Sequence, residues 1–551
     1  MTPLLASRSE KKNKHDTALK DAQTTTVTSF ELEEDLKTNP FRDRKAAEYW
    51  QAVYEKSQYE CREAFDPTLE WDAKEERKIV RKLDWHVCTW ACVMFFALQV
   101  DRGNLKQAVS ADMLEELSLS TNEYNYGNTI FLLSFLLAEL PSQLISKAVG
   151  PDRWVPMQML LWSVVAAAQA SIQGKASFYA CRALIGMLEG GFIPDLVLWL
   201  SYFYTSSELP IRLSFFWTAL DVTSILTSLL AFGLLRMDGI HSLSGWRWLF
   251  LVEGLLTFAI GAMSFFLMPS SAVATKTWFR PKGWFTDREV GVVVNRVLRD
   301  DPSKGDMHNR MAFTAARLWR ALSDYDMWPI YLIGLIVYIP MNPVSNYITI
   351  SLRQLGFSTF HTNLLVIPHT VASVVTLIGL TWISERINER SLIAMIQNVW
   401  VIPCLLALRF WPGSQTDPWG TYALITTLLA YPYCHAIMVG WASRNSGSVR
   451  TRSISAACYN ICVQLGNVAG SNIYRTADSP LYRRGNSILI GLNVIAILIF
   501  PATKLYYKAR NNKRERRWKS MSEEQKKEYL DSTTDEGNKR LDFRFGNRIL
   551  S

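Results

Sequence analysis

The chain has 551 residues, of which 49% are hydrophobic and 20% are charged, and its formal net charge is +9. Its mean hydropathy of +0.03 would suit an ordinary soluble protein. Residues 1–82, 269–326 and 508–551 are strongly polar, however, so the rest of the chain is far more apolar than the mean. The apolar runs exclude a disordered scaffold, and they make a soluble enzyme or a nucleic-acid binder a poor explanation of the basic charge.

Each apolar run extends to about 20 residues, the length at which an α-helix crosses a lipid bilayer. We expect twelve transmembrane helices, over residues 84–105, 124–147, 154–173, 177–204, 212–235, 247–268, 328–350, 361–383, 391–411, 419–441, 453–474 and 486–507. The sequence therefore predicts an all-α, multi-pass membrane protein. Its two six-helix bundles are expected in residues 83–268 and 327–507.

Basic residues near the span ends predict the topology. They cluster before the first span, in the central loop of residues 269–326, and after the last span. Because such clusters remain on the cytoplasmic side, we expect the loop and both termini in the cytoplasm, and the plasma membrane as the location. The amino-terminal arm, residues 1–82, has the composition of a largely disordered segment, although residues 46–59 could form a charged surface helix. Residues 511–529 of the cytoplasmic carboxy-terminal tail, residues 508–551, could form another.

Seven of the eight cysteines lie inside predicted spans, where small thiol side chains usually pack against neighbouring helices. Cys458 and Cys462 share a helix face, but no histidine or acid accompanies them, so we expect no metal site. No metal-binding cluster, nucleophile motif or phosphate-binding loop stands at a span end. A membrane enzyme is therefore disfavoured.

Charged groups inside the spans are candidates for function, because a charge in lipid is costly unless it faces a wet cavity or a partner. Those of the first six spans are Asp101, Arg102, Glu139, Arg182, Glu189, Asp195, Asp221 and Glu253. The last six spans offer mainly histidines and amides, namely Asn342, Asn346, His369, His435, Gln464, Asn467 and Asn493. The first half therefore favours electrostatic interactions and the second half hydrogen bonding.

The fourth span is the most informative segment. Arg182, Gly186 and Glu189 are spaced by four and three residues, which places them in one stripe along a helix. Arg182 and Glu189 are then about 10 Å apart along the axis, too far for a direct ion pair. A substrate, water or a residue from another helix could lie between them. The glycines are expected to let a neighbouring helix approach closely.

Arg102 is the best candidate for binding an anion, because its guanidinium is permanently charged and its donors fit carboxylate, sulfonate or sulfate oxygens. The alternative is that Arg102 extends to the membrane interface at a span end. Asp101 could take up a proton inside a cavity, or it could be an ordinary acid at a helix end. Glu139, beside Pro141, could belong to the cavity or act as a structural lock.

In the second half, Pro340 and Pro343 interrupt the seventh span, and a broken helix exposes backbone groups that a cavity or its ligand must satisfy. Asn342 and Asn346 are therefore candidate substrate-binding residues. The secondary candidates are two amides, which are weaker, and two histidines that could relay protons or serve as hydrogen-bonded fixtures: Gln464, Asn467, His369 and His435.

Several motifs resemble a known family. The two sets of six spans and the segment Arg182-x-x-x-Gly186-x-x-x-Gly190 resemble the major facilitator superfamily, whose loop motif is partly present at Gly150-Pro151-Asp152-Arg153. The closer resemblance is to the anion:cation symporter family, in particular its fungal allantoate permease branch. It rests on Asp101-Arg102-Gly103-Asn104, Glu139-Leu-Pro141-Ser142 and Gly245-Trp-Arg-Trp-Leu-Phe250. This resemblance implies that Asp101 and Glu189 take up protons, that Arg102 binds the anion, and that Arg182 tunes the glutamate.

These features predict a secondary transporter that imports a small organic or sulfur-containing anion by alternating access. The substrate classes are a carboxylate, ureide, sulfonate, sulfate or vitamin, with protons as the coupling ion and no other cofactor. The expected partners are the small anionic substrate and the lipid bilayer, and not nucleic acid. The alternative is a nutrient sensor that keeps the transporter fold and signals through its cytoplasmic tail.

Overall fold

The computed structural model describes residues 39–546, except for residues 206–207, 306–321, 388, 447–448 and 534–536. Contacts within the chain define two compact units. One, the arm–loop unit, comprises Met1–Ala91, Val197–Ser214 and Leu267–Met311. The other, the bundle unit, comprises Cys92–Leu196, Phe215–Phe266 and Ala312–Ser551. The regular structure of the described residues is helical, which confirms the predicted all-α class.

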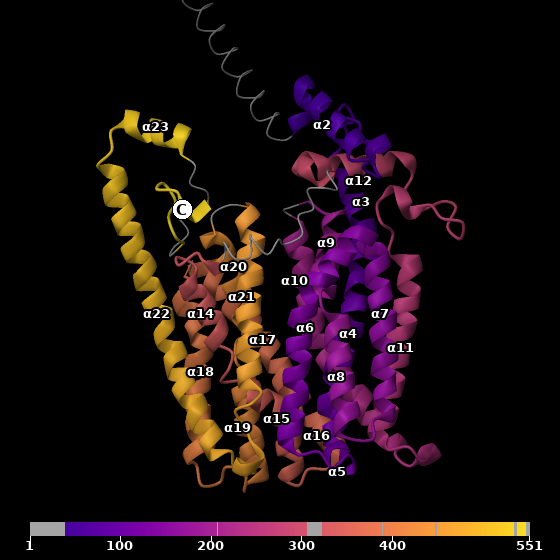
Figure 1. The fold of residues 1–551 in the computed structure, drawn as a ribbon, viewed down its shortest axis with the longest axis vertical. Helices are drawn as coiled ribbons and strands as arrows, with labels where there is room; N and C mark the ends of the chain where they lie inside the picture. Colours follow the sequence, from indigo (N-terminus) through magenta and orange to yellow (C-terminus); the bar gives the residue numbers. More distant parts are fainter. Residues whose placement is uncertain are drawn as a thin grey trace, which may run out of the picture. The chain divides into compact units, whose positions relative to one another are not determined.

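Every predicted span coincides with a helix or with a pair of helices (Figure 1). In the first half these are α4 (Thr89–Ser110), α6 (Thr121–Val149), α7 (Pro151–Ala168), α8 (Lys175–Glu189), α9 (Phe192–Ser201), α10 (Leu209–Leu234) and α11 (Gly245–Leu267). In the second half they are α14 (Trp328–Ile336), α15 (Asn342–Gln354), α16 (Thr359–Leu365), α17 (Ile367–Ile387), α18 (Ser391–Phe410), α19 (Pro418–Leu429), α20 (His435–Asn445), α21 (Val449–Gly470) and α22 (Arg483–Lys519). Among the described residues, seven helical stretches are individually long and apolar enough to cross a membrane.

Two helix breaks lie beside candidate site residues. The α8 helix ends at Glu189, and Gly191 follows with φ of +84°, a left-handed conformation that suits glycine. The predicted interruption of the seventh span is confirmed, because α14 ends at Ile336 and α15 begins at Asn342. A proline at the first turn of α15 is compatible with this start, since it removes an N–H that would have no partner there.

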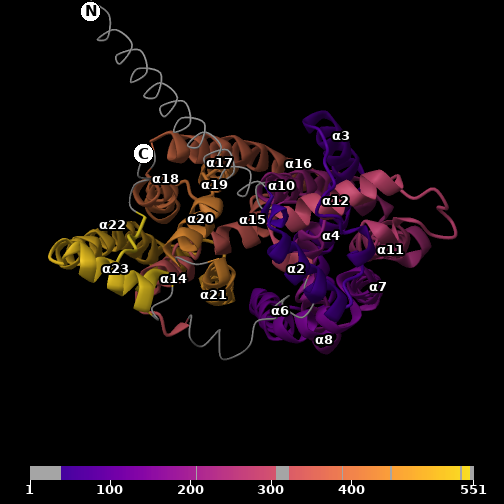
Figure 2. The same ribbon diagram turned by 90° about the horizontal axis from the view of Figure 1, so that it is seen from above.

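Glycines bring α6 and α8 close together, as predicted. The two helices lie side by side in Figure 2. A Cβ atom on Gly190 would stand 2.9 Å from the carbonyl oxygen of Phe135, and one on Gly186 would collide with the backbone of Phe131. Small residues let helix backbones approach each other in lipid, where packing replaces the hydrophobic effect as the driving force. This contact holds the helix that carries Arg182 and Glu189.

The first span is longer than predicted. We expected it to end at residue 105, but α4 continues to Ser110 and includes the polar residues Lys106 and Gln107. Both polar residues lie inside the bundle unit. Gln107 is buried, and its Nε2 lies 3.5 Å from Thr227 Oγ1. Lys106 Nζ lies 3.3 Å from Ser345 Oγ on α15. A polar residue that faces another helix cannot be distinguished from a solvated flank by composition alone.

The two halves of the bundle unit meet at the end where α5 (Met113–Glu116) and α16 are labelled in Figure 1. Asn125 Nδ2 donates to the Tyr474 carbonyl at 2.6 Å, and the Tyr347 hydroxyl donates to Asn125 Oδ1 at 2.7 Å. Arg353 forms an ion pair with Asp112 at 3.0 Å. These polar contacts close that end of the interface between the halves.

The expectation that the arm is largely disordered is wrong from Asn39 onward, while residues 1–38 lie outside the described part. The arm forms α2 (Arg44–Lys56) and α3 (Ala73–Leu83), and α12 (Asp287–Asp300) of the central loop belongs to the same unit. Tyr54, only 1% exposed, donates its hydroxyl to the Pro302 carbonyl at 2.9 Å. The arm folds because its scattered apolar residues bury against a loop more than 200 positions away.

Ion pairs stabilise the arm–loop unit internally. Arg296 is buried, and it bonds Glu208 at 2.8 Å and the Phe203 carbonyl at 2.8 Å. Lys82 pairs with Glu289 at 2.7 Å. Burial alone would raise the pKa of Glu289, but hydrogen bonds from Lys82 and the Thr286 backbone outweigh it and hold the pKa below its usual value.

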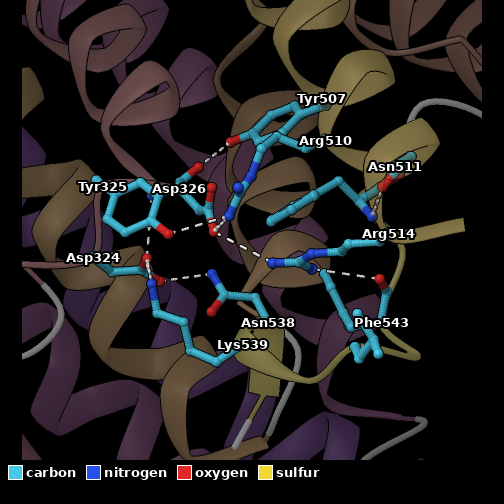
Figure 3. A network of polar contacts seen from close by, with 12 residues as sticks. Asp324, Tyr325, Asp326, Tyr507, Arg510, Asn511, Arg514, Asn538, Lys539 and Phe543 are labelled. Carbon is cyan, nitrogen blue, oxygen red and sulfur yellow. Dashed lines mark hydrogen bonds and ion pairs between the residues drawn. The ribbon is translucent and has the colours of Figure 1, made fainter. Parts of the chain in front are cut away.

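The carboxy-terminal tail returns to the start of the second half (Figure 3). The carboxylate of Asp326, which is fully buried, accepts from Arg510 at 2.8 Å and from Arg514 at 3.4 Å. Lys539 pairs with Asp324 at 2.5 Å. The two helices expected in charged segments are present, since α2 covers part of residues 46–59, and α22 with α23 (Glu523–Ser532) covers much of residues 511–529. The described tail is therefore a folded part of the bundle unit.

Candidate substrate and proton site

An ion pair joins two of the predicted site residues. Arg102 on α4 donates its Nε to Glu189 Oε2 at the end of α8, at 2.7 Å. Glu189 is fully buried, whereas 22% of the Arg102 side chain is exposed. A buried carboxylate needs a partner of this kind, because the desolvation of an unpaired charge is costly. Arg102 is therefore the residue from another helix that lies near Glu189, one of the three possibilities that the sequence left open.

The spacing predicted that Arg182 and Glu189 are too far apart for an ion pair, and they form none in the structure. The guanidinium of Arg182 stands 4.4 Å from the centre of the Phe131 ring, on α6. Arg102 lies over the neighbouring Phe135 ring at 4.9 Å. Rings of this kind attract a cation through their negative faces. Arg182 is buried, yet its Nε and Nη1 have no hydrogen-bond partner among the described residues. The two arginines thus keep donors that a ligand could use.

Asp101 has a hydrogen-bond partner of its own beside the Arg102–Glu189 pair. It is fully buried, and its Oδ2 accepts from the Trp162 indole at 3.0 Å. Glu253 on α11 is also buried, and neither of its carboxylate oxygens has a hydrogen-bond partner in the described structure. Electrostatic coupling links these two acids. Asp101 also lies within electrostatic range of Glu189, so it belongs to the surroundings of the Arg102–Glu189 pair although its hydrogen bond goes to Trp162.

Glu139 is half-buried on α6, and its charge interacts with that of Arg102. Glu139 therefore lies near the Arg102–Glu189 pair, although it forms no direct ion pair with Arg102 in the described structure. Asp195 is buried on α9. The side chain of Asp221 lies outside the described residues.

The amides of the second half form a connected chain across two helices. Asn346 Nδ2 donates to Asn342 Oδ1 at 3.1 Å, both on α15. Asn342 Nδ2 donates to Asn467 Oδ1 on α21 at 3.1 Å, and Asn467 Nδ2 donates to Gln464 Oε1 at 3.2 Å. The structure therefore brings all four predicted amides together beside the break between α14 and α15. Such a chain offers both donors and acceptors to a polar molecule.

The two histidines occupy different surroundings. His435 begins α20, and its ring stacks on Tyr433 at 5.6 Å with an interplanar angle of 9°. Its Nδ1 has no hydrogen-bond partner among the residues described. His369 lies on α17, within electrostatic range of the Lys106 ammonium. The structure does not join the two histidines into one relay.

Sequence reasoning missed one charged residue, Lys106, which lies just beyond the predicted end of the first span at residue 105. A sequence signal existed for Lys106, since it follows Arg102 by four residues and so lies on the same face of a continuing helix.

The helical fold, the apolar spans and the buried charges define a membrane transporter. The sequence matches the Major Facilitator Superfamily over residues 91–471, and the chain belongs to that family. It is 44% identical over 514 residues to the uncharacterized transporter YIL166C of Saccharomyces cerevisiae, which covers 93% of this chain and 95% of the relative. The protein is accordingly a multi-pass transporter embedded in the lipid bilayer.

Solved structures show the same fold at low sequence identity. A bacterial homologue of the human lysosomal transporter Spinster aligns with a TM-score of 0.60 at 14% identity, covering 77% of this chain and 97% of that chain. A D-xylose–proton symporter aligns with a TM-score of 0.56 at 12% identity, covering 76% and 97% respectively. These likenesses concern the fold alone.

Proposed function

We propose that this protein is a proton-coupled importer of a small organic or sulfur-containing anion, within the anion:cation symporter family and its allantoate permease-like branch. The observation that carries the proposal is the 2.7 Å ion pair between Arg102 and Glu189. It joins a permanently charged anion-binding group to a titratable one. In a membrane-embedded pair of this kind, the arginine can release the glutamate carboxylate and bind a substrate anion in its place.

In the proposed cycle, ionised Glu189 holds Arg102 and competes with the substrate. A proton taken up by Glu189 removes that competitor, and the guanidinium becomes available to a carboxylate, sulfonate or sulfate. Asp101 is the second proposed proton site. Binding of the anion and the proton from outside then favours rocking of the two halves, which closes the end where Asn125, Tyr347 and Tyr474 meet and opens the opposite, cytoplasmic end.

Import and the basic span ends support a plasma-membrane location with both termini in the cytoplasm. The arm gives less support to the alternative of a nutrient sensor. From Asn39 onward it has a structural role, because α2 and α3 are integral to the arm–loop unit. We therefore place the function in the bundle unit.

The first experiment measures uptake into proteoliposomes from a panel of labelled carboxylates, ureides, sulfonates, sulfate and vitamins, at external pH 5 and 7. We expect acid-stimulated uptake of at least one anion. Arg102→Ala should weaken its binding by about 10- to 100-fold, because a hydrogen bond to a charged group contributes about 1.5–3 kcal/mol. Arg409→Ala, which removes an arginine bonded to Ser487 near the end of α18, is the matched control.

Wild-type affinity in Arg102→Ala would remove the role assigned to this residue. Uptake of neutral compounds only, with the same rate at both pH values, would contradict the proposed function itself.

A further inference from the structure

Lys106 is a cation on the same face of α4 as Arg102, one helical turn further along. Its side chain reaches the second half of the bundle unit, where Nζ lies 3.3 Å from Ser345 Oγ on α15. The position is fixed by the backbone as well, because Thr349 Oγ1, also on α15, donates to the Lys106 carbonyl at 2.8 Å. The ammonium therefore lies where the two halves of the transporter meet.

The charge of Lys106 is not matched within the described structure. No carboxylate among the described residues lies within 4.0 Å of its ammonium. Other lysines that reach into the protein have such a partner, as Lys82 has Glu289 and Lys304 has Asp300. Lys106 is partly buried, and the Ser345 hydroxyl is the hydrogen-bond partner of its ammonium among the described residues, so part of its desolvation cost is uncompensated. An anion supplied from outside the chain would compensate it.

The surroundings of the ammonium are neutral and rich in hydrogen-bonding groups. Asn346 follows Ser345 on α15, and its amide begins the chain that continues through Asn342 to α21. His369, on α17, is a titratable group within electrostatic range of the Lys106 ammonium. On α4 itself, Arg102 is already matched by Glu189. Lys106 is thus a separate positive charge with amides beside it.

We propose that Lys106 is a second anion-binding group, which holds the substrate's oxyanion together with Arg102, and that the substrate is an organic anion with a polar body. Its carboxylate or sulfonate meets the ammonium, and its hydrogen-bonding body meets the amides of α15 and α21. This inference rests on the proposed function, in which Arg102 and Glu189 couple the substrate to a proton. Because Lys106 contacts both halves, a bound anion there touches both moving parts of the transporter.

The test uses the full-length protein in proteoliposomes, with labelled allantoate, succinate, isethionate and sulfate as probes. For each probe that the wild type transports, Lys106→Gln should raise KM at least tenfold. It should leave the dependence of uptake on external pH unchanged, because the Arg102–Glu189 pair is intact. Lys106→Arg keeps the charge and should restore KM to within about threefold. Lys175→Gln removes an exposed lysine that pairs with Glu123, and it should leave KM unchanged.

A merely structural role is separated by Ser345→Ala, which removes the hydrogen-bond partner of the ammonium and leaves its charge. We expect this variant to keep KM within about threefold of the wild type. A defect in Ser345→Ala equal to that of Lys106→Gln would overturn the proposal, since the contact between the halves would then be what matters. An unchanged KM in Lys106→Gln would overturn it too.

A measurement on the wild type keeps the proposal testable if Lys106→Gln fails to fold. Reductive methylation of lysine amines, followed by mass spectrometry, should be slowed at Lys106 by a transported probe and unaffected at Lys175. Equal methylation at Lys106 with and without that probe would contradict the assignment. If the wild type neither binds nor transports any probe, the proposed function fails together with this inference, whereas transport without a role for Lys106 overturns only the inference.

Discussion

Buried arginines in the two units differ in how completely their donors are matched. In the arm–loop unit, Arg296 bonds the Glu208 carboxylate and the Phe203 carbonyl, each at 2.8 Å, and among the described residues its Nε has no hydrogen-bond partner. In the bundle unit, Arg182 is equally buried, but its Nε and Nη1 lack hydrogen-bond partners among the described residues. Removing one partner of a buried ion pair destabilises the fold, because the other charge stays buried without a partner. A buried charge without an oppositely charged partner is itself costly, and inside a membrane protein such a charge indicates a binding or proton site.

The largest effects are expected when each of these two arginines is replaced separately by an uncharged residue. Arg296→Gln should lower the free energy of unfolding by about 3 kcal/mol, because it removes a buried guanidinium and leaves the partly buried Glu208 without its partner. Arg182→Gln should preserve stability and reduce anion uptake at least tenfold. Thermal unfolding followed by tryptophan fluorescence, together with uptake in proteoliposomes, measures both effects.

The exposed pair between Arg288 and Glu75 is the control for Arg296, and Arg288→Gln should not change thermal unfolding. If Arg182→Gln unfolds as readily as Arg296→Gln, the difference between the two units disappears.

A second prediction separates packing from charge around the same site. Gly186→Ala should destabilise the protein by about 1–3 kcal/mol and disturb the Arg102–Glu189 pair, since the added methyl group meets the Phe131 backbone. Gly379→Ala on α17 is the matched control, because a Cβ there meets nothing within 4 Å. Differential scanning calorimetry of the two purified variants compares their thermal stability. Equal stability would show that α6 and α8 can separate without cost.

The smallest expected effect concerns pH and the arm–loop unit. Hydrogen bonds hold the pKa of Glu289 below its unfolded value, despite its burial. Its pair with Lys82 therefore contributes stability at pH values above the unfolded pKa, and this contribution is lost as the pH falls through the lower, folded pKa. Glu289→Gln should flatten the loss of thermal stability between about pH 5 and pH 3. An unchanged profile would mean that the pair is not linked to folding.

Much of the fold could be predicted because each membrane helix corresponds to a continuous run of apolar residues in the sequence. Each apolar run corresponds to a helix or a pair of helices, and the spacing of Arg182, Gly186 and Glu189 predicted both the shared stripe and the missing ion pair. The break at Asn342 followed from prolines that cannot continue a helix. These features depend on neighbours within a few residues.

What could not be predicted depends on distant partners. Arg102 meets Glu189 across 87 positions of the chain, and Lys106 meets Ser345 across 239 positions. The arm folds only because residues such as Asn295, which donates to the Ala64 carbonyl at 2.9 Å, contact it from the central loop. The composition of a segment indicates whether it could fold alone, but it does not show which distant parts of the chain will contact it.

If the Arg102–Glu189 pair couples an anion to a proton, each transported anion should bring protons with it, and these can be measured. A pH-sensitive dye sealed inside proteoliposomes should report acidification when the wild type takes up a transported anion. Glu189→Gln should retain anion exchange in counterflow and lose the acidification, because its side chain no longer binds and releases a proton. Acidification by Glu189→Gln equal to that of the wild type would contradict the account.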